Sequence, residues 1–437
     1  PERTSYNEVV LRGRLREALE RLNPQLPAEA IEKALHTATT VHEPTLVKRN
    51  HAFHRMMLDG VPVDWSTDPG SGPGRKVHDH ARLLDFQDPD NNDFLIVDQF
   101  TITGTKQPRR PDLIAFVNGL PLAVIELKNP VDADADVWHA YQQLQTYKEQ
   151  IDPLFTPNAA LVVSDGINAR IGSLTAKPEW YMPWRVVKHE DDKPSVEFEL
   201  ETLVRGFFDR TLLLDYLRYF ILFEKDGDRL IKKIAGYHQF HGVREAVKAT
   251  VIASRPMSTG TVVSEPRATY GREVEPGSRK AGVFWHTQGS GKSISMACYA
   301  GKLLQRPEMQ NPTLVVVTDR NDLDGQLFQQ FSNAQELLKQ QPVQVESRDE
   351  LREKLAAVQS GGIFFTTVQK FGLLEGESEH PVLCGRSNVV VISDEAHRSQ
   401  YGQKGRLNTK TGEYVFGFSK YMRDALPNAS FIGFTGT

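Results

Sequence analysis

A glycine-rich segment containing a lysine and a serine has the residue types needed to bind a phosphate chain. It runs from His286 to Ser293 and follows the apolar run 281–285, which indicates a strand, a loop and a helix beginning near Gly291. Backbone N–H groups in such a loop can surround phosphates, and the helix N-terminus adds partial positive charge. Lys292 can reach the β- and γ-phosphates, and the Ser293 hydroxyl can bind Mg²⁺. The alternative is a simple glycine turn.

This segment predicts an ATP site, with ATP and Mg²⁺ as cofactors. It departs from the usual pattern in one place, because that pattern opens with glycine and this chain has a histidine. We assign nucleotide binding to all eight residues: His286, Thr287, Gln288, Gly289, Ser290, Gly291, Lys292 and Ser293.

Two carboxylates stand directly after another apolar run. Residues 389–393 lead into Asp394, Glu395, Ala396 and His397, and ligands bind at the carboxyl ends of strands in an open parallel sheet. Asp394 is placed to hold Mg²⁺ through water, and Glu395 to polarise the attacking water. His397 can couple the nucleotide to a moving element. Two acids at a helix N-terminus would also fit, but the lysine loop favours the nucleotide site.

Further short apolar runs alternate with helical stretches in the same half of the chain. They cover residues 313–318, 363–367 and 430–437. This alternation predicts an α/β fold with a doubly wound parallel sheet.

A different chemistry is indicated in the first half, within residues 111–128. Two apolar runs flank Asn118-Gly119, which predicts a β-hairpin. Strand alternation puts Glu126 and Lys128 on one face, and the hairpin can bring Asp112 near them. Two carboxylates suit Mg²⁺, which polarises a phosphodiester and activates water, while the lysine can stabilise the transition state. The alternative is an edge hairpin with solvated charges, but a glutamate inside an apolar run needs a partner.

Residues 134–150, which follow the hairpin, have a helical pattern. Gln143 and Tyr147 are four residues apart and therefore share one helix face. By themselves they can be ordinary helix-surface residues. Residues 210–250 also have a helical pattern, with a strongly apolar run at 212–223 that we expect to pack between domains.

The second half of the chain resembles the first motor domain of superfamily 2 helicases and translocases. The resemblance rests on the lysine loop, on 394–397 and on the segment Thr435-Gly436-Thr437, which in that family links the nucleotide state to the DNA track. Gln239 resembles the upstream glutamine that reads adenine in that family, although it can equally be a surface helix residue.

The whole pattern resembles the restriction (R) subunits of type I restriction–modification enzymes. Asp112 followed by Glu126-x-Lys128 is similar to their PD-(D/E)xK nuclease motif. Gln143 and Tyr147 resemble a following Gln-x-x-x-Tyr motif that supports the cleavage site or the DNA. The histidine that opens the phosphate loop also agrees with this family.

The resemblance implies ATP-driven translocation along double-stranded DNA, with Mg²⁺-dependent cleavage at a distance. It further implies docking to methyltransferase and specificity subunits, in a prokaryotic cytoplasm. Two alternatives use the same residues. One is a standalone nuclease–helicase for DNA repair or phage defence, and the other is a non-cleaving DNA-remodelling ATPase whose hairpin is structural.

The domain order implied by the resemblance begins with a PD-(D/E)xK endonuclease domain over 1–205. A helical connector with the adenine-reading glutamine follows over 206–250, and a first RecA-like motor domain covers 251–437. Because no second motor domain follows, we expect a fragment that binds ATP but hydrolyses it poorly.

Composition limits the class of protein. The 437 residues are 39% hydrophobic and 25% charged, with a net charge of −4, which is typical of an ordinary globular protein with more than one core. No apolar run is long enough to span a membrane, and the start of the sequence does not show the pattern of a signal peptide. Two cysteines argue for a reducing interior, and no zinc-binding spacing is present. The charge does not favour a bulk polycation, although a local basic groove would not appear in the sum.

Overall fold

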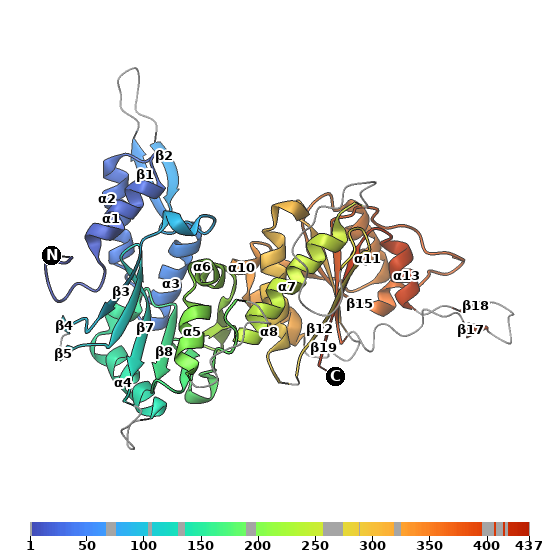
Figure 1. Ribbon diagram of the computed structural model, residues 1–437. Helices are drawn as coiled ribbons and strands as arrows, with labels where there is room; N and C mark the ends of the chain where they lie inside the picture. The colour runs from blue at the N-terminus through green and yellow to red at the C-terminus, as the bar shows by residue number, and fades with distance from the viewer. Residues whose placement is uncertain are drawn as a thin grey trace. The chain divides into compact units, whose positions relative to one another are not determined.

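The computed structural model describes residues 2–66, 76–103, 107–129, 136–188, 198–256, 274–287, 289–318, 325–395, 406–407, 414–415 and 418–436. The chain divides into two compact units, Pro1–Tyr237 and His238–Thr437 (Figure 1). The division lies at the start of helix α7 (Tyr237–Ser254).

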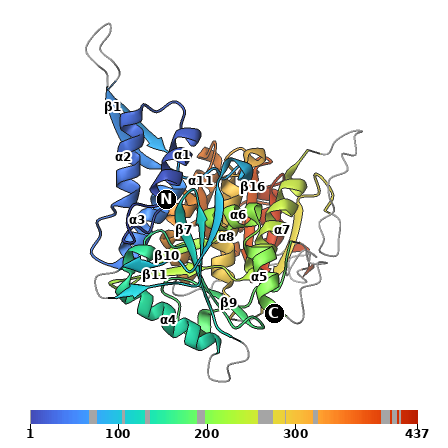
Figure 2. The same ribbon diagram turned by 60° about the vertical axis from the view of Figure 1, so that its left-hand side comes forward.

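The first unit is built around a five-stranded mixed sheet in the order β3-β6-β7-β8-β9. Its strands are β3 (Phe94–Asp98), β6 (Leu113–Val117), β7 (Leu120–Leu127), β8 (Ala160–Ser164) and β9 (Ala169–Gly172). Strands β7 and β8 are parallel, and the other neighbours are antiparallel. Parallel neighbours need a crossover connection, and helix α4 (Val137–Gln150) supplies it by packing on both strands (Figure 2).

The remaining elements of this unit are helices and short strand pairs. The helices are α1 (Arg12–Leu22), α2 (Ala28–Thr39), α3 (Leu46–Asp59), α5 (Glu199–Phe207) and α6 (Arg210–Tyr219). The antiparallel pairs are β1 (Val61–Ser66) with β2 (Lys76–Ala81), β4 (Ile102–Thr103) with β5 (Pro108–Arg109), and β10 (Ile221–Asp226) with β11 (Arg229–Ile234).

The predicted hairpin over 111–128 is confirmed as β6 and β7. Val117 pairs with Leu120 across Asn118 and Gly119, whose φ angles are 52° and 77°. A two-residue turn with two positive φ angles is the conformation that asparagine and glycine favour. Strand β7 is buried along almost its whole length. Glu126 therefore lies in an apolar setting.

The prediction of continuous helix over 210–250 is wrong for residues 221–234. These residues form the hairpin of β10 and β11, with Asp226 opposite Arg229 and a positive φ of 57° at Gly227. The two turn residues are Gly227 and Asp228, and glycine at the first of two turn positions favours such a turn. The long apolar run therefore changes from helix to strand after Tyr219.

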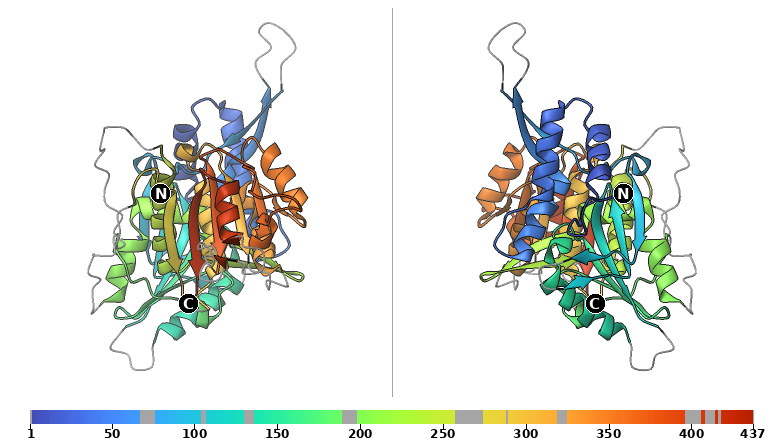
Figure 3. Two further views of the ribbon diagram at one scale, coloured as in Figure 1. Left: turned by 90° about the vertical axis from the view of Figure 1, so that its right-hand side faces the viewer. Right: turned by 90° about the vertical axis from the view of Figure 1, so that its left-hand side faces the viewer.

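The second unit contains a six-stranded parallel sheet in the order β12-β19-β16-β13-β15-β14 (Figure 3). Its strands are β12 (Lys280–Trp285), β13 (Thr313–Thr318), β14 (Pro342–Gln344), β15 (Ile363–Thr367), β16 (Val389–Asp394) and β19 (Ser430–Thr435). Besides α7, its helices are α8 (Lys292–Leu304), α9 (Gln326–Asn333), α10 (Gln335–Leu338), α11 (Arg348–Ala357) and α13 (Phe418–Ala425). A short antiparallel pair joins β17 (Arg406–Leu407) to β18 (Tyr414–Val415).

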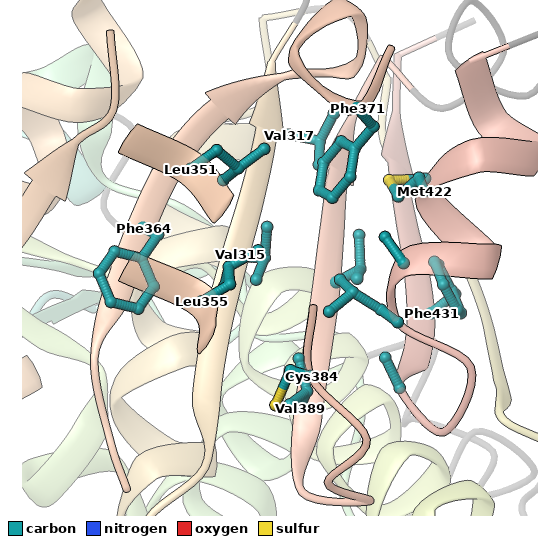
Figure 4. Packing of buried hydrophobic residues seen from close by; sticks show 14 of the residues in the cluster. Val315, Val317, Leu351, Leu355, Phe364, Phe371, Cys384, Val389, Met422 and Phe431 are labelled. Atoms are coloured by element: carbon teal, nitrogen blue, oxygen red, sulfur yellow. The ribbon is translucent and has the colours of Figure 1, made fainter. Parts of the chain in front are cut away.

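Helices cover both faces of this sheet. On one face, Phe431 of β19 belongs to a buried apolar cluster with Leu351 of α11 and Met422 of α13 (Figure 4). On the other face, the ring of Phe434 packs 5.6 Å from that of Tyr299 on α8. Residues three apart on a strand point to opposite faces, so the sheet is sandwiched. The predicted α/β fold with a parallel sheet is thus confirmed for this unit.

Candidate functional site

The phosphate loop of the second unit lies between β12 and α8, as the sequence predicts. Gly289 and Gly291 have φ angles of 81° and 83°, a left-handed conformation that glycine adopts at low cost. Gly291 caps the N-terminus of α8, and Lys292 and Ser293 are its first two residues. Gln288 lies outside the described residues. The loop thus leads directly into the positive end of a helix dipole.

Three neighbouring strands bring the other predicted residues to the same edge of the sheet. Strand β19 lies between β12 and β16, and all three are parallel. Their carboxyl ends carry the phosphate loop, Thr435 with Gly436, and Asp394 with Glu395. His397 and Thr437 lie outside the described residues.

Lys292 is the centre of charge at this edge. Its ammonium forms an ion pair with Asp394 at 2.8 Å and a second ion pair with Glu395. Burial opposes the charged form of the lysine, but the hydrogen bonds and charges of the two acids outweigh it and raise the lysine pKa. Glu395 has a φ of 45°, which is uncommon for a residue with a side chain.

His286 connects the phosphate loop to strand β19. Its backbone N–H donates to the carbonyl of Thr435 at 2.8 Å, and its ring Nδ1 lies 2.9 Å from the hydroxyl of Ser290. The ring is 3% exposed and packs 4.5 Å from the ring of Phe284. Burial, together with the nearby His238 and Lys292, lowers the pKa of His286 to about 4, so the ring is neutral at physiological pH.

Gln239 contacts the phosphate loop directly. The residue is buried in α7, and its side-chain amide donates to the carbonyls of Ser290 at 3.2 Å and Gly291 at 2.9 Å. A Cβ atom at Gly291 would lie 2.7 Å from this amide nitrogen. The glutamine is therefore not an ordinary surface residue, and it supports the loop. Its reading of adenine stays a prediction.

The hairpin of the first unit brings its three predicted residues together. One carboxylate oxygen of Asp112 accepts a hydrogen bond of 2.8 Å from the backbone N–H of Leu127, between Glu126 and Lys128. The Lys128 ammonium donates to Glu126 at 3.3 Å. Asp112 directly precedes β6, and β6 pairs antiparallel with β7. The register of the hairpin therefore places the first acid beside the Glu-x-Lys segment.

Glu126 is held in an unusual electrostatic state. It is 1% exposed, and among the described residues its Oε2 has no hydrogen-bond donor. Burial raises its pKa to about 7, the charge of Asp112 adds to this effect, and Lys128 opposes it. The carboxyl group thus titrates near neutral pH and lacks full charge compensation from the protein.

Helix α4 adds Gln143 and Tyr147 to the same site. The Lys128 ammonium donates to the side-chain oxygen of Gln143 at 2.5 Å, and the Gln143 amide donates to the Tyr147 hydroxyl at 2.5 Å. Tyr147 is 3% exposed, and burial is the main cause that raises its pKa to about 12. The side chain of Asp136 caps the N-terminus of this helix, which fixes where the helix begins.

Sequence reasoning missed one residue at this site, Gln99. Its side-chain amide donates to the other carboxylate oxygen of Asp112 at 3.1 Å. Gln99 lies at the end of β3, which pairs with β6, so only the register between strands brings it to Asp112. No local pattern in the sequence could have signalled this contact.

In the described parts of the chain, no group of three or more His, Cys, Asp or Glu side chains is arranged to hold a metal ion. At the hairpin, Asp112 and Glu126 supply two carboxylates. No described helix has the length and apolar character required to cross a membrane.

These features define the class of the second unit, and comparisons with known proteins agree. A parallel sheet with a phosphate loop opposed by two acids suits nucleotide binding, and residues 238–437 match the SWI2/SNF2 ATPase family. Residues 1–180 match the family of the N terminus of type I restriction enzyme R proteins.

Individual relatives extend the match across the whole chain. The chain is 49% identical over its full length to the type I restriction enzyme HindI endonuclease subunit of Haemophilus influenzae. It is 33% identical over its full length to the putative type I restriction enzyme MjaIXP endonuclease subunit of Methanocaldococcus jannaschii. The chain belongs to the family of type I restriction enzyme R subunits, and it spans 39% of the length of each of these relatives.

Proposed function

We propose that this chain performs the two chemistries of a type I restriction endonuclease subunit. The second unit drives ATP-dependent translocation of double-stranded DNA, and the first unit is a PD-(D/E)xK nuclease that cleaves phosphodiesters with Mg²⁺. The observation that carries the proposal is the convergence of Asp112, Glu126 and Lys128 with Gln143 and Tyr147 at one place in the first unit.

The hairpin site fits a magnesium ion. Mg²⁺ prefers oxygen ligands and is usually held by one or two carboxylates, with water and phosphate completing its shell. Asp112 and Glu126 would supply those carboxylates. The buried Oε2 of Glu126 has no donor among the described residues, so a cation would supply the charge compensation that is missing there.

Each residue of the hairpin site then has a chemical role. Mg²⁺ held by Asp112 and Glu126 would polarise the phosphodiester and activate water. Lys128 can stabilise the negative charge that develops on the phosphate. Its ammonium is oriented by Glu126 and Gln143, and Tyr147 in turn holds the Gln143 amide. The lysine is therefore preorganised before the substrate arrives.

The second unit fits ATP with Mg²⁺. Lys292 would hold the β- and γ-phosphates at the N-terminus of α8, where backbone N–H groups and the helix dipole favour anions. Ser293 and Asp394 would hold Mg²⁺, and Glu395 would orient the attacking water. The lysine lies against both acids, which supports a nucleotide and metal site at this edge of the sheet.

Partners and domain limits belong to the same proposal. The relatives are named as endonuclease subunits of type I restriction enzymes, which supports methyltransferase and specificity subunits as partners and double-stranded DNA as substrate. We assign 1–205 to the nuclease, 206–250 to a connector and 251–437 to the first motor domain. The connector includes the hairpin of β10 and β11 as well as helices. The predicted cytoplasmic location stays a prediction.

The test is cleavage of supercoiled DNA by the full-length subunit assembled with its methyltransferase and specificity partners. Lys128→Ala is expected to lower Mg²⁺-dependent cleavage by about 10²- to 10³-fold, since it removes one preorganised positive group. ATP turnover should be unchanged, because the second unit carries it. Lys33→Ala, at an exposed lysine on α2, is the matched control and should cleave like the wild type.

Other outcomes favour the alternative functions. Cleavage by the wild-type subunit without its partners would indicate a standalone nuclease–helicase. ATP turnover with no cleavage under any condition would indicate a remodelling ATPase whose hairpin is structural.

A further inference from the structure

Gln99 occupies a strained position next to the proposed metal ligand. It directly follows β3, and its backbone N–H donates to the carbonyl of Asp112 at 2.9 Å, which extends the pairing of β3 with β6 by one residue. Its φ angle is 50°. This left-handed conformation is natural for glycine and tolerated by asparagine, but it costs energy for glutamine.

The chain around Gln99 forces this bend. Phe100, the next residue, is 6% exposed, and its ring packs 5.4 Å from the ring of Phe116. The backbone must turn sharply between the last pair of the strand ladder and this buried ring. Glycine would make the same turn without strain, so the turn itself gives no reason for a glutamine.

The side chain of Gln99 supplies that reason. Its amide donates to one carboxylate oxygen of Asp112 at 3.1 Å, while the backbone N–H of Leu127 donates to the other oxygen at 2.8 Å. The carboxylate is thus held from both neighbours of β6: by Gln99, which follows β3, and by Leu127 at the end of β7. Two donors fix the plane of the carboxylate relative to Glu126 on β7.

A second left-handed glutamine shows what this conformation looks like without such a contact. Gln310 in the second unit is exposed and has a φ of 49°. Its side chain makes no hydrogen bond to the residues that the structure describes; its backbone N–H donates to the carbonyl of Pro307, and its own carbonyl accepts from Asn388. The two glutamines share the same backbone conformation, and only Gln99 uses its amide on a proposed metal ligand.

We propose that Gln99 is a positioning residue of the nuclease site, which orients the carboxylate of Asp112 for a divalent cation. This inference rests on the proposed nuclease function. Partners in the outer shell of a metal site orient the ligands, and their loss typically weakens metal affinity by 10- to 100-fold. A purely structural role for Gln99 would instead be visible as lost stability.

The test compares metal binding with stability for Gln99→Gly. Mn²⁺ binding to the 437-residue chain is measured by calorimetry, and the site is identified as the one that Asp112→Asn removes. We expect Gln99→Gly to weaken this site by about tenfold. Its thermal unfolding midpoint should equal or exceed that of the wild type, because glycine relieves the strained φ. In the assembled enzyme, half-maximal cleavage should need about tenfold more Mg²⁺.

Two further variants separate the amide from the backbone. Gln99→Met keeps the length and the strained backbone but removes the donor, and it should weaken Mn²⁺ binding as much as Gln99→Gly. Gln310→Gly relieves the same strain far from any proposed nuclease residue in sequence and should leave Mn²⁺ binding unchanged. Wild-type affinity in Gln99→Gly, or a large drop in its unfolding midpoint, would overturn the positioning role.

Failure of the underlying function has a different signature. If the wild-type chain binds no Mn²⁺ at a site removed by Asp112→Asn, the nuclease proposal fails and the role of Gln99 fails with it. If that site is present and Gln99→Gly does not affect it, only the positioning role fails.

Discussion

The two units each combine one lysine with two carboxylates, but the carboxylates occupy different places in their strands. In the first unit, Glu126 lies inside the apolar strand β7 and is 1% exposed. In the second unit, Asp394 ends strand β16, and its side chain is 16% exposed. Burial raises the pKa of Glu126 in the first site, whereas the two acids raise the pKa of Lys292 in the second. In the first site, the buried acid is therefore the group whose pKa is raised. In the second site, where Asp394 ends its strand, the pKa of the lysine is raised instead.

This difference shows how each site is prepared for its ligand. Lys292 pairs with both acids, so the second site is compensated by its own residues. Among the residues that the structure describes, Lys128 makes one ion pair, with Glu126, and donates a further hydrogen bond to the neutral Gln143. In the first site the buried Oε2 of Glu126 therefore has no partner among the described residues, and a cation there would supply one; without it, burial of this oxygen lowers stability.

The largest effect in this comparison is expected for Lys292→Ala. It removes the group that would hold the phosphates, so ATP turnover should fall on the order of 10³-fold, and ATP-dependent cleavage should be lost with it. The measurement is phosphate release by the assembled enzyme on DNA. Lys280→Ala, at the exposed start of β12, is the control and should retain turnover. Full turnover in Lys292→Ala would exclude the loop as the nucleotide site.

A second effect tests the burial of this carboxylate in the first site through Glu126→Gln. The folded-state pKa of Glu126, about 7, lies above its ordinary value of 4.5, so the folded state binds the proton more tightly than the unfolded state. Stability therefore falls as pH rises from about 4.5 to about 7, and the penalty is complete above pH 7 at about 3 kcal/mol. Glu126→Gln should recover much of this free energy of unfolding at pH 8 while abolishing cleavage.

Denaturant unfolding at pH 4 and pH 8 measures this effect. The gain from Glu126→Gln should be present at pH 8 and absent at pH 4, and Mg²⁺ should stabilise the wild type at pH 8 but not the variant. Glu149→Gln, at an exposed glutamate on α4, controls for loss of a carboxylate. A destabilised Glu126→Gln at pH 8 would show that Lys128 compensates the acid fully.

Local patterns made the strands and both sets of charged residues predictable. Strands in parallel sheets are buried on both faces and appear as continuous apolar runs. The turn residues Asn118 and Gly119 predicted the hairpin. Acids and lysines beside such runs have few structural explanations, so Glu126 and Lys292 could be selected from sequence.

Contacts that depend on register or on a change of element were not predictable. Gln99 reaches Asp112 only through the pairing of β3 with β6. The hairpin of β10 and β11 was not predicted, because the apolar run that includes its first residues suits a helix as well as a strand. Gly227 was the one local signal for its turn. The sequence left Gln239 equally open as an adenine-reading residue or a surface helix residue, and its hydrogen bonds to the loop carbonyls are visible only from the geometry of α7 against the loop.

The smallest expected effect is that of Tyr147→Phe, which tests whether the lysine of the first site is positioned through helix α4. The change leaves the amide of Gln143 without its acceptor, so we expect a loss of about 1 kcal/mol in stability and a reduction in cleavage of about tenfold or less. The pKa of Tyr147, about 12, keeps the phenol protonated, so the loss should not vary with pH between 6 and 9, within about twofold. Tyr141→Phe on the same helix, where the hydroxyl donates to the carbonyl of Ala176, should cleave normally. Equal losses in both variants would mean that α4 responds as a whole and that Lys128 is positioned by Glu126 alone.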